Sequence, residues 1–133
     1  MKKFRFRLEQ VLNFRKVEKK DRERELAFRN MELHTREQRL GAILDAQDKS
    51  NVPGGPLTMA EFALHSRYHE ALRRALERQR ELVQEAIKAV EIARDAYLEK
   101  AIETKTLETL KDHRRDEHRE EARREDRKEI DEL

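Results

Sequence analysis

The sequence predicts an all-α protein, a two-helix antiparallel coiled-coil hairpin whose longer C-terminal helix overhangs the pair. Three observations predict it. Charged residues make up 45% of the 133 residues and hydrophobic ones only 36%, whereas a compact domain carries about 25% and about 45–50%. Apolar residues recur with a heptad spacing in the second half of the chain. Apart from Gly41, every Gly and Pro falls within residues 53–56.

The Gly- and Pro-rich stretch predicts a loop over residues 50–57, because such a cluster ends one helix and precedes the next. The flanking segments hold no other cluster of helix breakers. We therefore expect a single coiled-coil domain (residues 1–133) with helices over residues 4–49 and 58–130. Thr58 is expected to cap the second helix, since Glu61 stands three residues later, as a capping box requires.

The two predicted helices differ in length, so the second should extend beyond the first. If the turn is centred near Pro53–Gly54, Phe4 faces residue 103, and residues 111–133 form an unpaired overhang. That overhang is nearly all charge. Acid-to-base pairs three residues apart, such as Asp112–Arg115, are expected to support it as a lone helix.

The second helix carries the clearer seam, with two sets of positions that each repeat every seven residues. One set reads Phe62, His69, Leu76, Val83, Val90, Tyr97 and Thr104, and the other reads His65, Leu72, Gln79, Ala86, Ala93, Lys100 and Leu107. The first helix has a thinner apolar stripe that Arg15, Lys19 and Arg22 interrupt. Polar residues in a seam lower stability while they fix the register, so we expect a pair of modest stability.

Composition and motifs exclude several classes of site. The absence of Cys excludes disulfides and thiolate metal sites. No stretch approaches the ~18 apolar residues of a membrane span, so we expect a cytoplasmic protein without direct membrane insertion. No phosphate-binding loop or catalytic motif occurs, and we expect no enzyme, no catalytic residues and no cofactor. His65 and His69, one turn apart and following Glu61, fit either a metal site or a polar patch in the seam; the patch is favoured, and no metal is expected.

Two surfaces are candidates for binding. Bases alternate with Phe4 and Phe6 in a start where residues 1–20 hold eight bases and two acids. This pattern fits the binding of nucleic acid or of an acidic membrane. It also fits two aromatic rings that pack against the second helix, and this second interpretation is favoured. The balanced net charge of +2 argues against a dedicated nucleic-acid binder. The other surface is a ridge beside the seam that consists of Tyr68, Leu72, Ala75 and Gln79. It fits either a partner-binding face or a wider core of the coiled coil.

Three motifs in order resemble the flagellar FliJ family. Residues 3–15 (KFRFRLEQVLNFR) resemble the family's opening, in which bases alternate with Phe before Leu-Glu-x-Val-Leu. Residues 99–111 (EKAIETKTLETLK) and the Arg- and Glu-rich end that closes on residues 128–131 (KEID) are also similar to the family. The resemblance covers essentially the whole chain.

The resemblance implies a non-enzymatic, stalk-like component of the flagellar type III protein export machine. Its partners would be the hexameric export ATPase, the cytoplasmic part of the membrane export gate, and export chaperones. The gate would bind the tip at Tyr68, Leu72, Ala75 and Gln79. On the first-helix side of that surface, Ala46 and Ser50 stand where the family often carries Tyr. The ends would face the ATPase ring through Phe4, Phe6, Arg114, Arg115, Arg119 and Arg123.

Three alternatives remain open. They are a homologous stalk of a virulence type III secretion system, a generic coiled-coil scaffold and a nucleic-acid-binding arm. The first shares the whole architecture with a flagellar stalk. Nucleic-acid binding would weaken steeply with salt.

Overall fold

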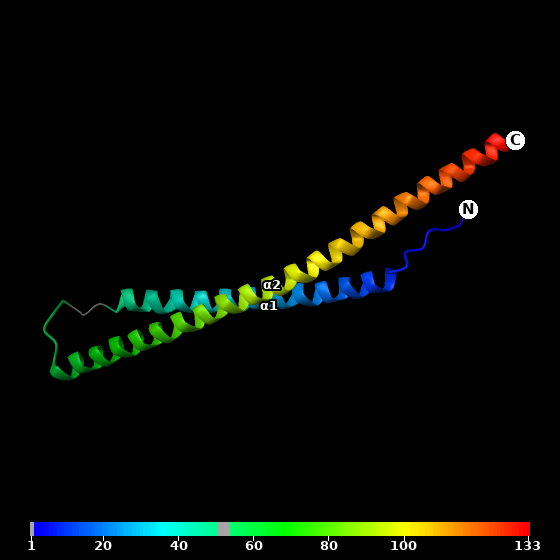
Figure 1. Ribbon diagram of the computed structural model, residues 1–133. Coiled ribbons are helices and arrows are strands. Elements are labelled where there is room, and N and C mark those ends of the chain that lie inside the picture. Colours follow the sequence, from blue (N-terminus) through cyan, green and yellow to red (C-terminus); the bar gives the residue numbers. More distant parts are fainter. Residues whose placement is uncertain (1, 51–53) are drawn as a thin grey trace. The chain divides into compact units, whose positions relative to one another are not determined.

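A computed structural model describes residues 2–50 and 54–133, and consists of two helices (Figure 1). α1 spans Glu9–Lys49 and α2 spans Met59–Glu132, and the described residues contain no strand. The helices form a hairpin, which confirms the predicted fold class. Contacts divide the chain into two compact units: the terminal unit (Met1–Arg24 and Asp95–Leu133) and the loop unit (Glu25–Arg94).

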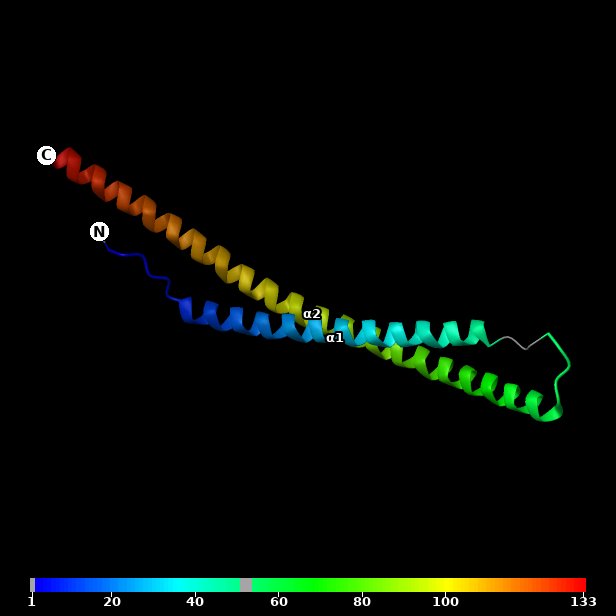
Figure 2. The same cartoon turned by 180° about the vertical axis from the view of Figure 1, so that it is seen from behind.

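In each unit, a segment of α1 runs antiparallel to a segment of α2, as opposite views show (Figures 1 and 2). In the terminal unit, Lys111 Nζ lies 2.8 Å from Glu9 Oε2. The side chains of Leu12 and Thr104 are only 1% exposed. The helix pair of this unit therefore ends near Glu9 and Lys111.

α1 begins at Glu9, five residues after the predicted start at residue 4. Residues 2–8 are not helical, and Phe4 contacts His118 with ring centroids 5.6 Å apart instead of facing residue 103. Phe4 lies five residues before Glu9. On α2, Phe4 contacts His118 and Glu9 contacts Lys111, and these two contacts are seven residues apart, which is about 10 Å at 1.5 Å per residue. Five helical residues would reach only about 7.5 Å. The prediction of helix here was wrong because apolar and basic residues alternate with period two, which suits an extended chain.

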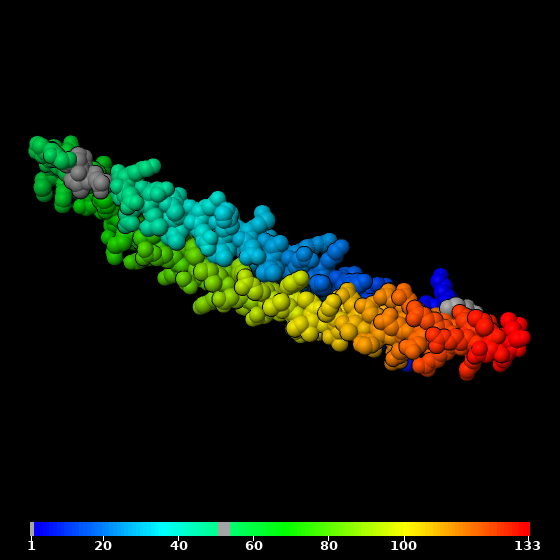
Figure 3. Space-filling view, turned by 90° about the horizontal axis from the view of Figure 1, so that it is seen from above, coloured from blue at the N-terminus to red at the C-terminus, as the bar shows by residue number. Residues whose placement is uncertain are grey.

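The predicted overhang is therefore partly covered. Residues 2–8 line a groove on α2, and the blue atoms of the first residues lie beside the orange part of α2 (Figure 3). The α2 residues that line it are Leu110, Arg114, Glu117, His118 and Glu121. Asp112 and Arg115 form the predicted ion pair at 2.8 Å. Glu120 pairs with Arg124, one turn further on.

In the loop unit, α2 extends past the end of α1. Arg36 Nη1 donates to the Leu82 carbonyl at 2.9 Å, and Gln79 Nε2 donates to the Arg36 carbonyl at 2.9 Å. Lys49 follows Arg36 by thirteen residues and therefore lies opposite about residues 66–69, counted back at the same helical rise. The first two turns of α2 have no α1 residue opposite them. Phe62, expected in the seam, is consequently 56% exposed.

The predicted cap of α2 is present. Glu61 N–H donates to Thr58 Oγ1 at 3.1 Å, and Thr58 N–H donates to Glu61 Oε2 at 3.4 Å. Ser50 and residues 54–57 are not helical, as expected, whereas residues 51–53 of the predicted loop lie outside the described residues. The predicted division into a single domain stays a prediction.

The core of the loop unit is a seam one side chain wide, and it follows the predicted heptad. Its buried members on α2 are small or medium in size: Leu76, Gln79, Val83, Ala86, Val90 and Ala93. α1 contributes half-buried Leu26, Leu33, Leu40 and Ile43. The heptad prediction is confirmed over this stretch, because the same positions that repeat in the sequence are the ones withdrawn from solvent.

Candidate interaction surfaces

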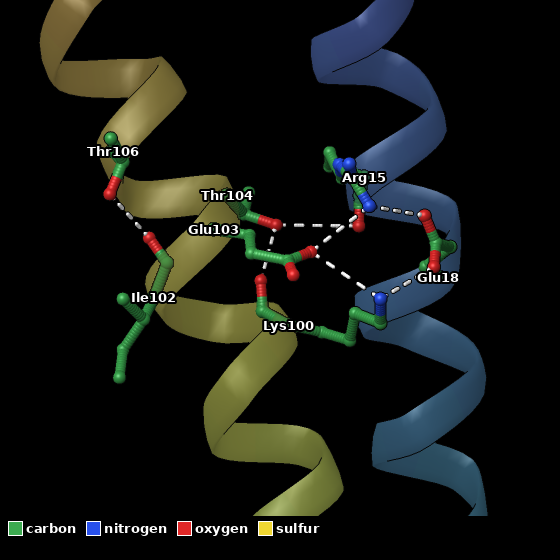
Figure 4. A network of polar contacts seen from close by, with 7 residues as sticks. All are labelled: Arg15, Glu18, Lys100, Ile102, Glu103, Thr104 and Thr106. Carbon is green, nitrogen blue, oxygen red and sulfur yellow. Dashed lines mark hydrogen bonds and ion pairs between the residues drawn. The ribbon is translucent and has the colours of Figure 1, made fainter.

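Four charged side chains form a closed network across the seam of the terminal unit (Figure 4). Arg15 Nη1 lies 3.1 Å from both Glu18 Oε1 and Glu103 Oε2. Lys100 Nζ lies 3.0 Å from Glu18 Oε2 and 3.4 Å from Glu103 Oε2. Each charge thus contacts two of opposite sign. The Thr104 hydroxyl adds a contact to α1, 3.3 Å from the Arg15 carbonyl, while it donates to the Lys100 carbonyl at 2.8 Å.

The network shifts the titration of two members. The hydrogen bond from Lys100, assisted by Arg15, holds the pKa of the Glu18 carboxyl below its ordinary value of 4.5. The hydrogen bond to Glu18 raises the pKa of Lys100 above its ordinary value of 10.5. Both shifts favour the ionised pair, so the folded state binds Glu18 protons more weakly and Lys100 protons more tightly than the unfolded chain does.

A pH dependence of stability follows. The contribution of Glu18 is complete above about pH 4.5 and is lost as the pH falls through the lowered pKa. The contribution of Lys100 is complete below about pH 10.5 and is lost as the pH rises through the raised pKa. We expect the thermal midpoint, measured by circular dichroism, to fall on both sides of this window. Glu18→Gln should flatten the acid side, and an unchanged acid slope in that variant would contradict the role of Glu18.

The predicted ridge lies at the start of α2, in the loop unit. Tyr68 is 47% exposed, and Leu72 and Ala75 are half-buried. Gln79 differs, since it is only 4% exposed and its amide donates to the Arg36 carbonyl. The ridge therefore runs from an exposed aromatic side chain at one end to a seam residue at the other. On α1, Ala46 is half-buried.

Exposed apolar side chains accompany Tyr68 where α2 extends past α1. Met59, Phe62 and Leu64 are all more than half exposed. Phe62 occupies a seam position of the heptad, but no α1 residue lies opposite it. The first turns of α2 are thus an unfinished seam beside the ridge, a feature typical of a helix-binding surface.

His65 and His69 lie in the same region with ring centroids 6.1 Å apart, and Tyr68 packs edge-on against His69. The described residues hold no group of three or more His, Asp or Glu side chains that could bind a metal ion. The pair is half-buried in the seam, in keeping with a polar patch.

The second predicted surface lies in the terminal unit. Phe4 and Phe6 are half-buried against α2, where they line a groove with Arg114. Arg115 pairs with Asp112. Arg119 and Arg123 are exposed, and neither takes part in an ion pair between described residues. This end therefore presents aromatic rings close to α2 and free guanidinium groups further along it.

The two-helix hairpin and its basic start with Phe4 and Phe6 can now be compared with known protein families. The model of the flagellar FliJ protein family matches residues 4–133. The chain belongs to this family. As a FliJ family member, it is a component of the flagellar protein export apparatus.

Neither the curated proteins nor the solved structures contain a significant match to this FliJ family member. Neither helix of residues 2–50 and 54–133 contains an apolar stretch that could span a membrane.

Sequence reasoning missed two features of this FliJ family member. Glu18 and Glu103, which complete the charge network, were not singled out, although each stands three residues from a seam cation, a spacing typical of ion pairs on helices. The exposed side chains of Met59 and Leu64 were also missed. The heptad could have found them, because it places neither residue at a seam position.

Proposed function

We propose that this chain works in the cytoplasm by binding, without catalysis, as a stalk between the hexameric export ATPase and the cytoplasmic part of the export gate. It also handles export chaperones and associates with the membrane only through the apparatus. Family membership over residues 4–133 is the observation that carries the proposal. The exposed apolar start of α2 and the free guanidinium groups of the terminal unit supply two surfaces for the two partners.

The gate binds the ridge at Tyr68, Leu72 and Ala75 in this proposal. Tyr68 is the only exposed aromatic member of the ridge, and aromatic anchors carry much of the binding energy at interfaces. Gln79 supports the surface from the seam by holding the Arg36 carbonyl.

Replacing both Tyr68 and Leu72 by Ala is expected to weaken gate binding by at least about tenfold, since loss of an anchor residue costs about 2 kcal/mol. The measurement is a titration of the full chain against the purified cytoplasmic part of the gate. Ile92→Ala removes an apolar side chain of the loop unit that is more exposed than Tyr68 (71% against 47%) and should leave binding unchanged. Unchanged affinity in the double variant, with an intact helical spectrum, would contradict the proposal that the gate binds this ridge.

The ATPase ring faces Phe4, Phe6, Arg114, Arg115, Arg119 and Arg123 in this proposal. Reversing Arg119 and Arg123 to Glu is expected to slow association with the hexamer by about tenfold at low salt, because exposed charges act mainly on the rate of encounter. A matched control reverses Arg78 and Lys88, two exposed bases of the loop unit. Equal association rates and equal stimulation of ATP hydrolysis by both variants would contradict the assignment of this end.

A further inference from the structure

The N-terminal residues 3–8, here called the alternating segment, follow the sequence pattern of a β-strand in an otherwise helical protein, and the last two of them, Arg7 and Leu8, form the turn that leads into α1. Lys3, Arg5 and Arg7 alternate with Phe4, Phe6 and Leu8. The exposure of the side chains alternates in the same way: the three bases are exposed and the three apolar residues are half-buried. Strict alternation of this kind is typical of a strand with one face covered. α2 covers that face here, with Phe4 against His118.

The backbone of the alternating segment has few hydrogen-bond partners. Among the described residues, its bonds are those that its Phe6 and Leu8 carbonyls accept from Glu9 and Leu12, at the start of α1. No backbone bond between described residues uses the N–H groups of residues 3–8 or the carbonyls of residues 3–5. Such a row of free donors and acceptors is the template by which an exposed strand pairs with another chain.

The outer face of the segment defines the chemistry of a partner. Lys3, Arg5 and Arg7 take part in no ion pair between described residues, so three free positive charges stand beside the free backbone. The groove between the segment and α2 has a volume of about 760 Å³. The segment is therefore held to α2 by its apolar side chains and not by its backbone.

We propose that the alternating segment binds as an added β-strand: it pairs along the exposed edge of a sheet in a partner protein, and that edge strand carries acidic side chains. Main-chain bonds supply affinity in this mode of recognition, and the alternating side chains supply specificity. Lys3, Arg5 and Arg7 meet the acidic row, while Phe4, Phe6 and Leu8 stay on α2. The mode of binding applies to any protein with such an edge, and is separate from the assignment of this end to the ATPase ring.

A cyclic β-hairpin peptide whose edge strands alternate Glu with Val is the probe. The matched control is the same hairpin with a methyl group on every outward-facing N–H, which keeps the charge and the fold but blocks the edge. Fluorescence anisotropy with the full chain should give about tenfold tighter binding for the unmethylated hairpin, which corresponds to one or two net hydrogen bonds. Equal binding of the two hairpins, or no binding of either, would overturn the proposal.

Two pairs of variants locate the bonded edge. Arg5→Pro and Arg5→Ala remove the same charge, but only the Pro variant also removes an N–H; Phe6→Pro and Phe6→Ala form the corresponding pair. Because N–H groups of consecutive strand residues point to opposite edges, one Pro variant should bind the hairpin about tenfold more weakly than its Ala control. Hydrogen exchange at residues 3–8 should slow in the complex. The proposal is wrong if neither Pro variant differs from its control and exchange is unchanged.

Discussion

A single Ala86→Asp substitution is expected to destabilise the helix pair of the loop unit by about 3–5 kcal/mol, the cost of leaving one charge buried without a partner. Ala86 is only 3% exposed and lies in the narrow seam of α2. The seam has room for only a methyl group at this position, so a hydrated carboxylate does not fit between the helices. Urea unfolding, followed by circular dichroism, measures the loss, and hydrogen exchange assigns it to residues 25–94.

Ala71→Asp is the matched control, since it introduces the same side chain at an exposed position of α2. It should cost less than about 1 kcal/mol, the difference in helix propensity. Lowering the pH below about 4 should restore part of the stability of Ala86→Asp, because the new carboxyl then becomes neutral. Equal midpoints for the two variants at pH 7 would show that Ala86 does not lie in a closed seam.

Leu12→Ala is expected to destabilise the terminal unit by about 3 kcal/mol, within the usual range of about 2–5 kcal/mol for a buried Leu. Leu12 is the one large apolar side chain of the described residues that is less than 2% exposed. It lies between the ion pair of Glu9 with Lys111 and the charge network at Arg15.

Leu98→Ala truncates a half-exposed Leu of the same unit and should cost less than about 1 kcal/mol, in proportion to the smaller area it buries. The free energies of unfolding of both variants come from urea titrations of the full chain. If Leu12→Ala matched Leu98→Ala, the terminal unit would owe its stability to its ion pairs and not to Leu12.

Local patterns predicted the helices, the seam and the cap. The heptad positions of α2 are buried from Leu76 to Ala93 because the spacing places them on one face of the helix. Thr58 and Glu61 form the expected capping box because their contact spans only three residues. Such features depend on neighbours in the sequence, so the sequence is sufficient to find them.

The register of the pair was not predictable in the same way. It depends on the course of the chain between the helices, and the assumption of a turn centred near Pro53–Gly54 placed Phe4 opposite residue 103 instead of His118. The error also hid the exposure of Phe62. The alternation of residues 3–8 was noticed, but its extended backbone was missed for another reason: Phe and Arg tolerate a helix, and the period-two pattern outweighs that weak preference.

The small side chains of the α2 seam have a consequence for heat capacity. Ala86, Ala93 and the polar Gln79 expose little new apolar surface when the helices separate. The heat capacity of unfolding should therefore fall below the about 12–15 cal/mol/K per residue of globular proteins. A small heat-capacity change makes the curve of stability against temperature shallow. The pair then keeps its modest stability nearly constant over a broad range of growth temperatures.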